Sequence, residues 1–465
     1  MRVAALLLSL LVAGCVSTGR DGGFADVSDA VSARTGAQTK WIRSDEDAKA
    51  ARDRVEALLA KPLTADDAIQ VALLNNPALQ ASYAELGVAG GDLMSAGALP
   101  NPRLSYLRAR HGDEYKIETI LSFNILSLVT VPLRLQAQRQ RFEQVKLESA
   151  GEALRVAADT RKAYWRALAA QQSARYAEDV NATAEASAEL ARRMAAAGNF
   201  SKVDRMRQHA FYAEATSQLA RARQQAVADR ERLIRLLGVW GNDTLRMQLP
   251  ERMPDLPGAP RELSNVEQLA MESRLDVQAA RRDAEATAKS LGLTRVTRFV
   301  DEFELGIARV REDPGPTKKG YEIGVPIPLF DWGSGRVTRA EALYMQAANR
   351  IAESAINARS EVREAYHGYR TAYDTAKHYR DEVVPLRKQI AEEMVLRYNG
   401  MLASVFELLV DAREQVLAVS SYVEALRDYW LADSDLQMVT TGRSPGALGT
   451  VTARSAPSAA SGGGH

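Results

Sequence analysis

Three stretches of the chain carry apolar residues at alternating spacings of three and four, which is the pattern of long amphipathic helices. They run from Val156 to Ala177, from Ala358 to Val383 and from Val405 to Trp430, and small residues fill much of each seam. Such a heptad-like seam favours helices that pack side by side at short distance. The helical pattern of the first stretch extends from Pro132 to Ala196, which would span roughly 100 Å of α-helix.

Two shorter regions alternate residue by residue, as strands with two different faces do. We expect one hairpin from Arg103–Arg110 and Lys116–Ile125, and another from Phe299–Arg309 and Tyr321–Leu329. In the first hairpin an apolar face opposes a polar one: Ile117, Thr119, Leu121, Phe123 and Ile125 against Lys116, Glu118, Ser122 and Asn124. Strands of about ten residues with two such faces suit a transmembrane β-barrel. Four strands cannot close a barrel, but three chains that supply four each would.

An internal repeat accounts for the order of these elements. The pairs that align without gaps at an offset of 202 residues are Arg134 with Arg336, Tyr164 with Tyr366, Gly198 with Gly400 and Val203 with Val405. Upstream, "ALLNNPALQAS" from Ala72 aligns with "AMESRLDVQAA" from Ala270. Each copy therefore contains a helix, a hairpin and two long helices, and the predicted fold is mainly α with a small β part.

The predicted organisation has six segments. Residues 1–15 are a signal peptide, 16–62 an N-terminal periplasmic segment, 63–241 the first repeat, 242–262 a Pro-rich linker, 263–441 the second repeat, and 442–465 a disordered Gly- and Ser-rich tail. The start "MRVAALLLSLLVAGC" has a basic residue, an apolar run and small residues before Cys15. This resembles a bacterial lipobox, which implies cleavage before Cys15 and diacylation of its thiol.

Composition narrows the classes of function. The net charge is +1 with 26% charged residues, which gives no reason to expect a nucleic-acid partner. Cys15 is the single cysteine, so neither a disulfide nor a Cys-based metal site is expected. The five histidines show no metal-ligand spacing, and nucleotide-binding and hydrolase motifs are missing. We expect no cofactor, no bound metal and no enzymatic activity.

One segment joins the last predicted strand to a long helix. The stretch "GVPIPLFDWGSGR" places Pro326 and Pro328 at the end of the strand, where they would stop the ladder. Gly333 and Gly335 would then absorb the change of direction. Trp332 would lie at the level of the lipid headgroups, as interfacial tryptophans do.

These motifs together resemble the TolC-like outer-membrane efflux factors: the lipobox, "NNPAL", the hairpins, "PLFDWG", the glycine turns and the duplication. The resemblance covers about Leu63 to Thr441. It implies a homotrimer with a 12-stranded barrel continuous with a 12-helix periplasmic tunnel, anchored by lipid in the outer membrane. It also implies a passive exit duct that meets a periplasmic adaptor and an inner-membrane pump, which we expect to be proton-driven.

The alternative is a non-conducting periplasmic coiled-coil scaffold lipoprotein. Whether the exported substrate is a metal ion, a drug or another small molecule stays open at this stage.

In such channels, the turns between the long helices form the periplasmic entrance and contact the adaptor. The corresponding candidates in this sequence are Gly198, Ser201, Asp204, Gly400, Ala403, Phe406 and Glu407. The offset of 202 residues pairs Asp204 with Phe406 and leaves Glu407 facing another way. Two alternatives therefore remain for the entrance: a ring of acidic side chains, or an apolar constriction formed by Phe406.

Overall fold

The computed structural model describes residues 19, 21–300 and 302–446. The predicted signal peptide with Cys15 lies outside the described residues, as does the tail beyond residue 446. The helices of the first half are α2 (Phe24–Thr35), α3 (Asp45–Leu59), α4 (Ala65–Asn75), α5 (Pro77–Gly97), α6 (Ile125–Ala196), α7 (Lys202–Leu237) and α8 (Asn242–Arg246). Those of the second half are α9 (Val266–Ser273), α10 (Leu275–Val296), α11 (Ser334–His378), α12 (Val384–Asn399) and α13 (Val405–Thr441), with a π-helix η1 (Tyr379–Val383) between α11 and α12.

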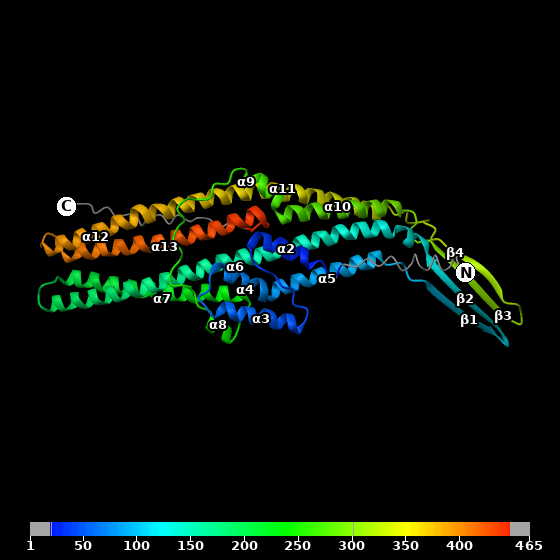
Figure 1. The fold of residues 1–465 in the computed structure, drawn as a ribbon, viewed down its shortest axis with the longest axis horizontal. Coiled ribbons are helices and arrows are strands. Elements are labelled where there is room, and N and C mark those ends of the chain that lie inside the picture. Colours follow the sequence, from blue (N-terminus) through cyan, green and yellow to red (C-terminus); the bar gives the residue numbers. More distant parts are fainter. Residues whose placement is uncertain (1–18, 20, 301, 447–465) are drawn as a thin grey trace. The chain divides into compact units, whose positions relative to one another are not determined.

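The two hairpins form one antiparallel sheet in the order β1-β2-β3-β4. The strands are β1 (Arg103–His111), β2 (Glu114–Asn124), β3 (Glu304–Asp313) and β4 (Lys318–Gly324). β2 of the first hairpin pairs with β3 of the second along ten residues of each strand. The order helix, hairpin, helices thus occurs twice, and the two copies meet at the centre of the sheet (Figure 1).

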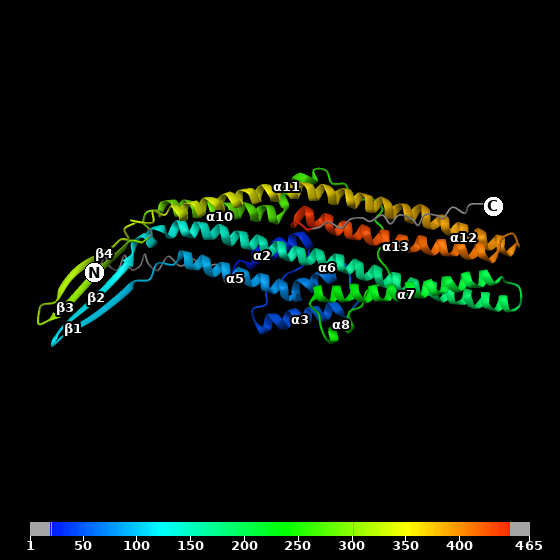
Figure 2. The ribbon, with the colours of Figure 1, turned by 180° about the vertical axis from the view of Figure 1, so that it is seen from behind.

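The described chain divides into two compact units. One comprises residues up to 30, 81–151 and 275–357, and it holds the sheet with α5, α10 and the adjoining parts of α6 and α11. The other comprises residues 31–80, 152–274 and 358 onward. In this second unit α7 runs beside α6, and α13 beside α12, in both views (Figure 1, Figure 2).

The core of the second unit forms where the predicted helical seams meet. Tyr164, Trp165, Tyr369, Tyr373 and Tyr429 lie almost entirely out of solvent among alanines and leucines. Trp165 and Trp430 stack with their ring centroids 4.8 Å apart. The small residues of the seam let α6, α11 and α13 approach, and the aromatic rings fill the space between them.

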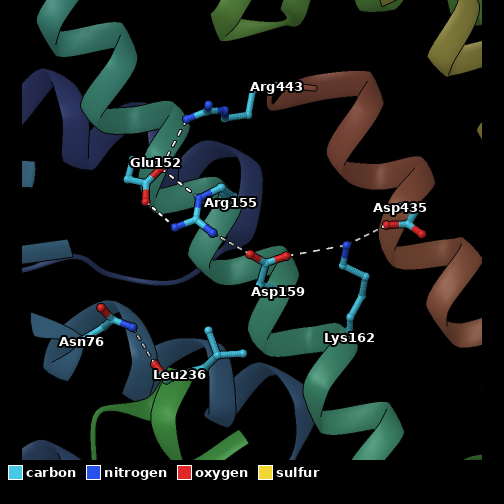
Figure 3. Close-up of polar contacts among 8 residues, drawn as sticks. All are labelled: Asn76, Glu152, Arg155, Asp159, Lys162, Leu236, Asp435 and Arg443. Carbon is cyan, nitrogen blue, oxygen red and sulfur yellow. Dashed lines mark hydrogen bonds and ion pairs between the residues drawn. The ribbon is translucent and has the colours of Figure 1, made fainter. Parts of the chain in front are cut away.

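The pattern predicts a single helix from Thr64 to Gly97, and the "NNPAL" motif breaks it into α4 and α5. Pro77 begins α5, and the Asn76 side-chain amide donates to the carbonyl oxygen of Leu236 at 2.8 Å, near the end of α7 (Figure 3). Asn75 donates to the carbonyl oxygen of Gly238 at 2.8 Å. The two asparagines therefore satisfy carbonyl groups that the end of α7 leaves free.

A chain of ion pairs also links α6 to α13 (Figure 3). Arg155 Nη1 lies 2.7 Å from Asp159, whose other oxygen is 3.6 Å from Lys162 Nζ. Lys162 Nζ reaches Asp435 of α13 at 3.0 Å. This network ties the returning helix to the first long helix of the chain.

The second hairpin and one helix differ from the sequence-based expectation. β3 and β4 occupy residues 304–313 and 318–324, whereas the pattern predicted strands over 299–309 and 321–329. β4 ends at Gly324, before Pro326, because neither Pro326 nor Pro328 can donate to a ladder. The pattern also predicts a single helix from Ser264 to Leu293, and this helix is broken at Arg274, the counterpart of Asn76.

Among the described helices, none is long and apolar enough to cross a membrane. Within the same residues, no cluster of three or more His, Cys, Asp and Glu side chains is placed to hold a metal ion.

Candidate functional site

The sheet register assigns every strand residue to one of two faces, because directly opposed residues of antiparallel strands share a face. One row of the first face contains Leu104, Leu121, Ile307 and Tyr321, and the next contains Phe123, Leu305 and Ile323. We call this side the apolar face. The opposite side, the polar face, carries Arg103 and Glu304, whose charged groups are 3.2 Å apart.

The joint between β4 and α11 is built around Gly333. This residue has φ +72°, and a Cβ at this position would lie 2.3 Å from the carbonyl oxygen of Arg298. The Gly333 N–H donates to Asp331 Oδ1 at 2.8 Å, and Arg298 Nε donates to the Trp332 carbonyl oxygen at 3.2 Å. Gly335 lies within α11 and has open space around it. Gly333 is thus required by the geometry, whereas Gly335 is not.

The two joints differ in form. In the first copy, β2 ends at Asn124 and α6 begins at the next residue, with Asn124 Oδ1 accepting from the Ser127 N–H at 2.8 Å. The second copy instead has an irregular segment from Val325 to Gly333. This segment exposes apolar side chains to an unusual degree: Ile327 75%, Leu329 69%, Phe330 98% and Trp332 58%. A band of apolar side chains therefore continues from the apolar face into the joint.

The first helical turn, between α6 and α7, combines a glycine and a capping serine. Gly198 has φ +81°, the left-handed conformation in which glycine carries no steric penalty. Ser201 Oγ accepts from the Asp204 N–H at 3.1 Å and donates to Asp204 Oδ2 at 2.6 Å. Asp204 therefore lies in the first turn of α7, where a negative charge is favoured by the helix dipole.

The second turn, between α12 and α13, uses a different residue for the left-handed position. Gly400 has φ −79°, and Met401 adopts φ +57° instead. The cap is a reciprocal capping box, in which Ser404 Oγ accepts from the Glu407 N–H and the Ser404 N–H donates to the Glu407 carboxylate at 2.7 Å. These bonds from Ser404 lower the pKa of Glu407, so its carboxylate stays ionised.

The two caps correspond at an offset of 203 residues, one more than the sequence repeat. Ser201 matches Ser404 and not Ala403, and Asp204 matches Glu407 and not Phe406. The second copy has therefore gained one residue between Tyr366 and the turn. The π-helix η1 lies in this interval, and a π-turn accommodates one more residue than an α-turn.

Side chains of α13 also contact the other helical pair near this end of the second unit. Arg413 lies 2.8 Å from Glu214 of α7 and 5.3 Å from the ring centroid of Phe211. A groove of about 150 Å³ is lined by these helices, including Tyr176 and Val416. The Arg413–Glu214 pair is half-exposed, so it constrains the two helical pairs only weakly.

The structure thus brings Ser201 with Asp204 into one cap, and Glu407 with Ser404 into another. The side chain of Phe406 is not among those described. Sequence reasoning missed Met401, Ser404 and the Arg413–Glu214 pair. The signal for the capping box was available in the sequence, because a serine stands three residues before Glu407. The ion pair had no such local signal, because Arg413 and Glu214 lie 199 residues apart along the chain.

Comparison with known proteins gives a family match for the first repeat. Residues 68–239 match the family described as outer membrane efflux protein. The cobalt-zinc-cadmium resistance protein CzcC of Cupriavidus metallidurans is 27% identical over 293 residues. That alignment covers 60% of this chain and 66% of CzcC, so the chain matches slightly less than two thirds of this relative's length.

Two solved structures illustrate the similarity of fold. The outer membrane protein VceC of Vibrio cholerae has a TM-score of 0.68 at 18% identity, covering 82% of this chain and 96% of VceC. CusC, whose structures describe transmembrane channel formation, has a TM-score of 0.67 at 16% identity, covering 84% of this chain and 92% of CusC. At these identities the likeness concerns the fold.

Proposed function

We propose that this chain is a TolC-like outer membrane efflux protein and forms one of three subunits of a passive exit duct across the outer membrane. In this proposal three four-stranded sheets close a barrel, and the long helices continue it as a tunnel into the periplasm. Energy comes from an inner-membrane pump, which acts through a periplasmic adaptor. The chain itself supplies the conduit and no chemical step.

The observation that carries the proposal is the single sheet made from both repeats. Its apolar face suits lipid and its polar face suits a water-filled lumen. β1 and β4 are open edges, and unpaired backbone groups at such edges are not tolerated in a bilayer. Pairing of β4 with β1 of a neighbouring chain would remove both edges and close the barrel.

The test of this function is assembly and conduction. Protein purified in detergent should have the mass of three chains by light scattering, and it should form ion-conducting pores in planar bilayers. A stable monomer, or a trimer that never conducts, would favour a periplasmic scaffold instead.

We further propose that Cys15 is diacylated and anchors the mature chain to the outer membrane. The apolar run and small residues before Cys15 support this proposal. Replacing Cys15 by serine should abolish labelling by a radioactive fatty acid. Persistent labelling of Cys15→Ser would show that the lipid is attached elsewhere.

The periplasmic entrance is proposed to lie at the two capped turns. In a trimer, Asp204 in the first turn of α7 and Glu407 in the first turn of α13 would supply six carboxylates. This number favours an acidic entrance over an apolar constriction. Asp204→Asn should then reduce cation preference in single-channel recordings. If Phe406→Ala raises conductance while Asp204→Asn leaves ion preference unchanged, the constriction is apolar.

Divalent transition-metal cations are the substrates that we propose to test first, because CzcC is named for resistance to cobalt, zinc and cadmium. Cells that lack this chain should accumulate radioactive zinc, and the restored chain should reverse the accumulation. Unchanged metal content with increased retention of a dye would assign the channel to organic compounds.

A further inference from the structure

The sheet separates its charges by face. The charged strand residues of the apolar face are Arg108, Arg110, Arg309, Arg311 and Lys319, with Asp313 as the one acid. The polar face instead carries five acids, Glu114, Glu118, Glu304, Glu312 and Glu322, against the bases Arg103, Lys116 and Lys318. Positive charge is therefore concentrated on the side that would contact lipid, where an arginine is costly at the bilayer midplane and tolerated near the headgroups.

These cations are available to a partner. The side chains of Arg108, Arg309, Arg311 and Lys319 are exposed, and none of the four has an ion-pair partner within the described residues. Arg110 Nε donates to the Gly112 carbonyl oxygen at 2.8 Å, and its ion pair with Asp113 is loose, at 3.7 Å. By contrast, all three bases of the polar face pair with glutamates of their own face.

An apolar groove lies beside the cations on the same face. It has a volume of about 470 Å³ and is lined by Leu99, Leu121, Phe123, Leu128, Ile307 and Tyr321, among others. Such a groove accepts a hydrocarbon chain and offers few polar groups to a soluble ligand.

The register sets the distance between groove and cations. Along β3, Ile307 of the groove is followed on the same face by Arg309 and Arg311, at steps of about 7 Å each. The cations belong to the strand residues nearer the hairpin turns, and the groove is lined by residues nearer the end where β2 leads into α6. Figure 1 shows these two ends of the sheet. If the helices extend into the periplasm, the cations lie at the level of the outer leaflet headgroups.

We infer that the apolar face is a binding site for a phosphorylated glycolipid of the outer leaflet, of the lipid A class. One acyl chain lies in the groove, and the phosphate groups accept charge-assisted hydrogen bonds from Arg309, Arg311, Lys319 and Arg108. This inference rests on the proposed function, because it requires the apolar face to contact the outer membrane.

Binding to the full-length trimer in a neutral detergent tests the inference. The probes are bisphosphorylated lipid A, the same lipid with both phosphates removed, and inorganic phosphate as a competitor. We expect bisphosphorylated lipid A to bind at least about tenfold more tightly than the dephosphorylated form, equivalent to about 1.4 kcal/mol. Millimolar inorganic phosphate should not displace it, because it lacks the acyl chain.

Two matched double variants separate the faces. Arg309→Gln with Arg311→Gln should lose the preference for the phosphorylated lipid. Lys116→Gln with Lys318→Gln removes the same charge from the polar face and should retain it. Equal affinity of the wild-type trimer for both lipids would overturn the inference without any variant, as would equal weakening in the two double variants or displacement by inorganic phosphate.

Conductance of the same preparations separates this inference from the proposed function. Trimers that conduct but do not discriminate between the two lipids contradict the lipid site alone. Protein that neither trimerises nor conducts contradicts the duct, and the lipid site with it.

Discussion

Gly333 shows how one residue fixes the joint between the sheet and α11. Its left-handed backbone and its approach to the Arg298 carbonyl oxygen both exclude a Cβ. Gly333→Ala should therefore destabilise the protein by about 1–2 kcal/mol for the backbone conformation, with a further loss from the contact. Thermal dissociation of the trimer measures this effect.

The neighbouring Gly335 provides the control. It lies within α11 with open space around it, so Gly335→Ala should stabilise the helix by about 0.5–1 kcal/mol. A loss of stability at both positions would mean that flexibility of the whole joint, and not the geometry of Gly333, is what matters.

The caps of the two turns lead to a second prediction at this scale. Ser404→Ala removes the acceptor of the Glu407 N–H and should cost about 1 kcal/mol of local stability at the start of α13. Hydrogen exchange of the Glu407 amide should accelerate accordingly. Ala403→Ser, the position that the repeat offset suggests for the cap, should leave this exchange rate unchanged.

Residue-level prediction from the sequence succeeded where the signal is local. The two faces of β2 follow from alternation alone, because successive side chains of a strand point to opposite sides. The need for Gly333 depends on the carbonyl group of Arg298, which lies 35 residues earlier in the chain. The capping box of Ser404 was obscured because the 202-residue alignment of the two repeats is one residue out of register at this turn. Contacts between distant segments and single-residue insertions are not visible in a periodic pattern.

At the scale of elements, the π-helix η1 accounts for the extra residue of the second repeat. Deleting Glu382, an exposed residue of η1, should convert the π-turn to α-helix and restore the 202-residue register. We expect the trimer to melt within a few degrees of the wild type, because π-turns are rarely favoured for their own stability.

Deletion of Ala169 from α6 is the matched control. This residue is buried, and one residue fewer turns the following helix by about 100° relative to its partners. The trimer should not form in this variant. If deletion of Glu382 is equally damaging, η1 is required for packing and does not merely absorb an insertion.

At the scale of the whole molecule, the network between α6 and α13 makes stability depend on pH. Glu152 belongs to this network because it pairs with Arg155 of α6 and with Arg443, which follows α13. Hydrogen bonds from Arg155 hold the pKa of Glu152 below its ordinary value of 4.5. A lowered pKa in the folded state stabilises the protein above about pH 4.5, and this stabilisation is lost as the pH falls through the folded-state pKa. The melting temperature should therefore decline in this acidic range, and Glu152→Gln should make the decline shallower.

Glu189 supplies the comparison for this measurement. Arg192 and Arg193 lower its pKa to about 2, but all three side chains belong to the same helix and the Glu189 side chain is 38% exposed. Solvent and salt screen such pairs, so Glu189→Gln should leave the decline unchanged. A similar effect of both variants would indicate a response to total charge and not to the network.

The architecture of the chain was more predictable than its turns. Duplication and the two periodicities indicate long helices and two hairpins, because both patterns repeat over many residues. The pairing of β2 with β3 could not be derived, since it joins two hairpins that are about 180 residues apart along the chain. Both turns carry a glycine at matching positions of the repeat, but only Gly198 takes the left-handed position, which Met401 occupies in the second turn.

That difference bears on the stoichiometry of any docking partner. One turn contains Gly198 and Asn199, whereas the other presents Met401 and Leu402 with 94% and 80% of their surfaces exposed. In a trimer the two kinds of turn would alternate around the rim, three of each. A partner that requires Met401 and Leu402 would bind in three copies per trimer. A partner that tolerates both kinds of turn would bind in six copies.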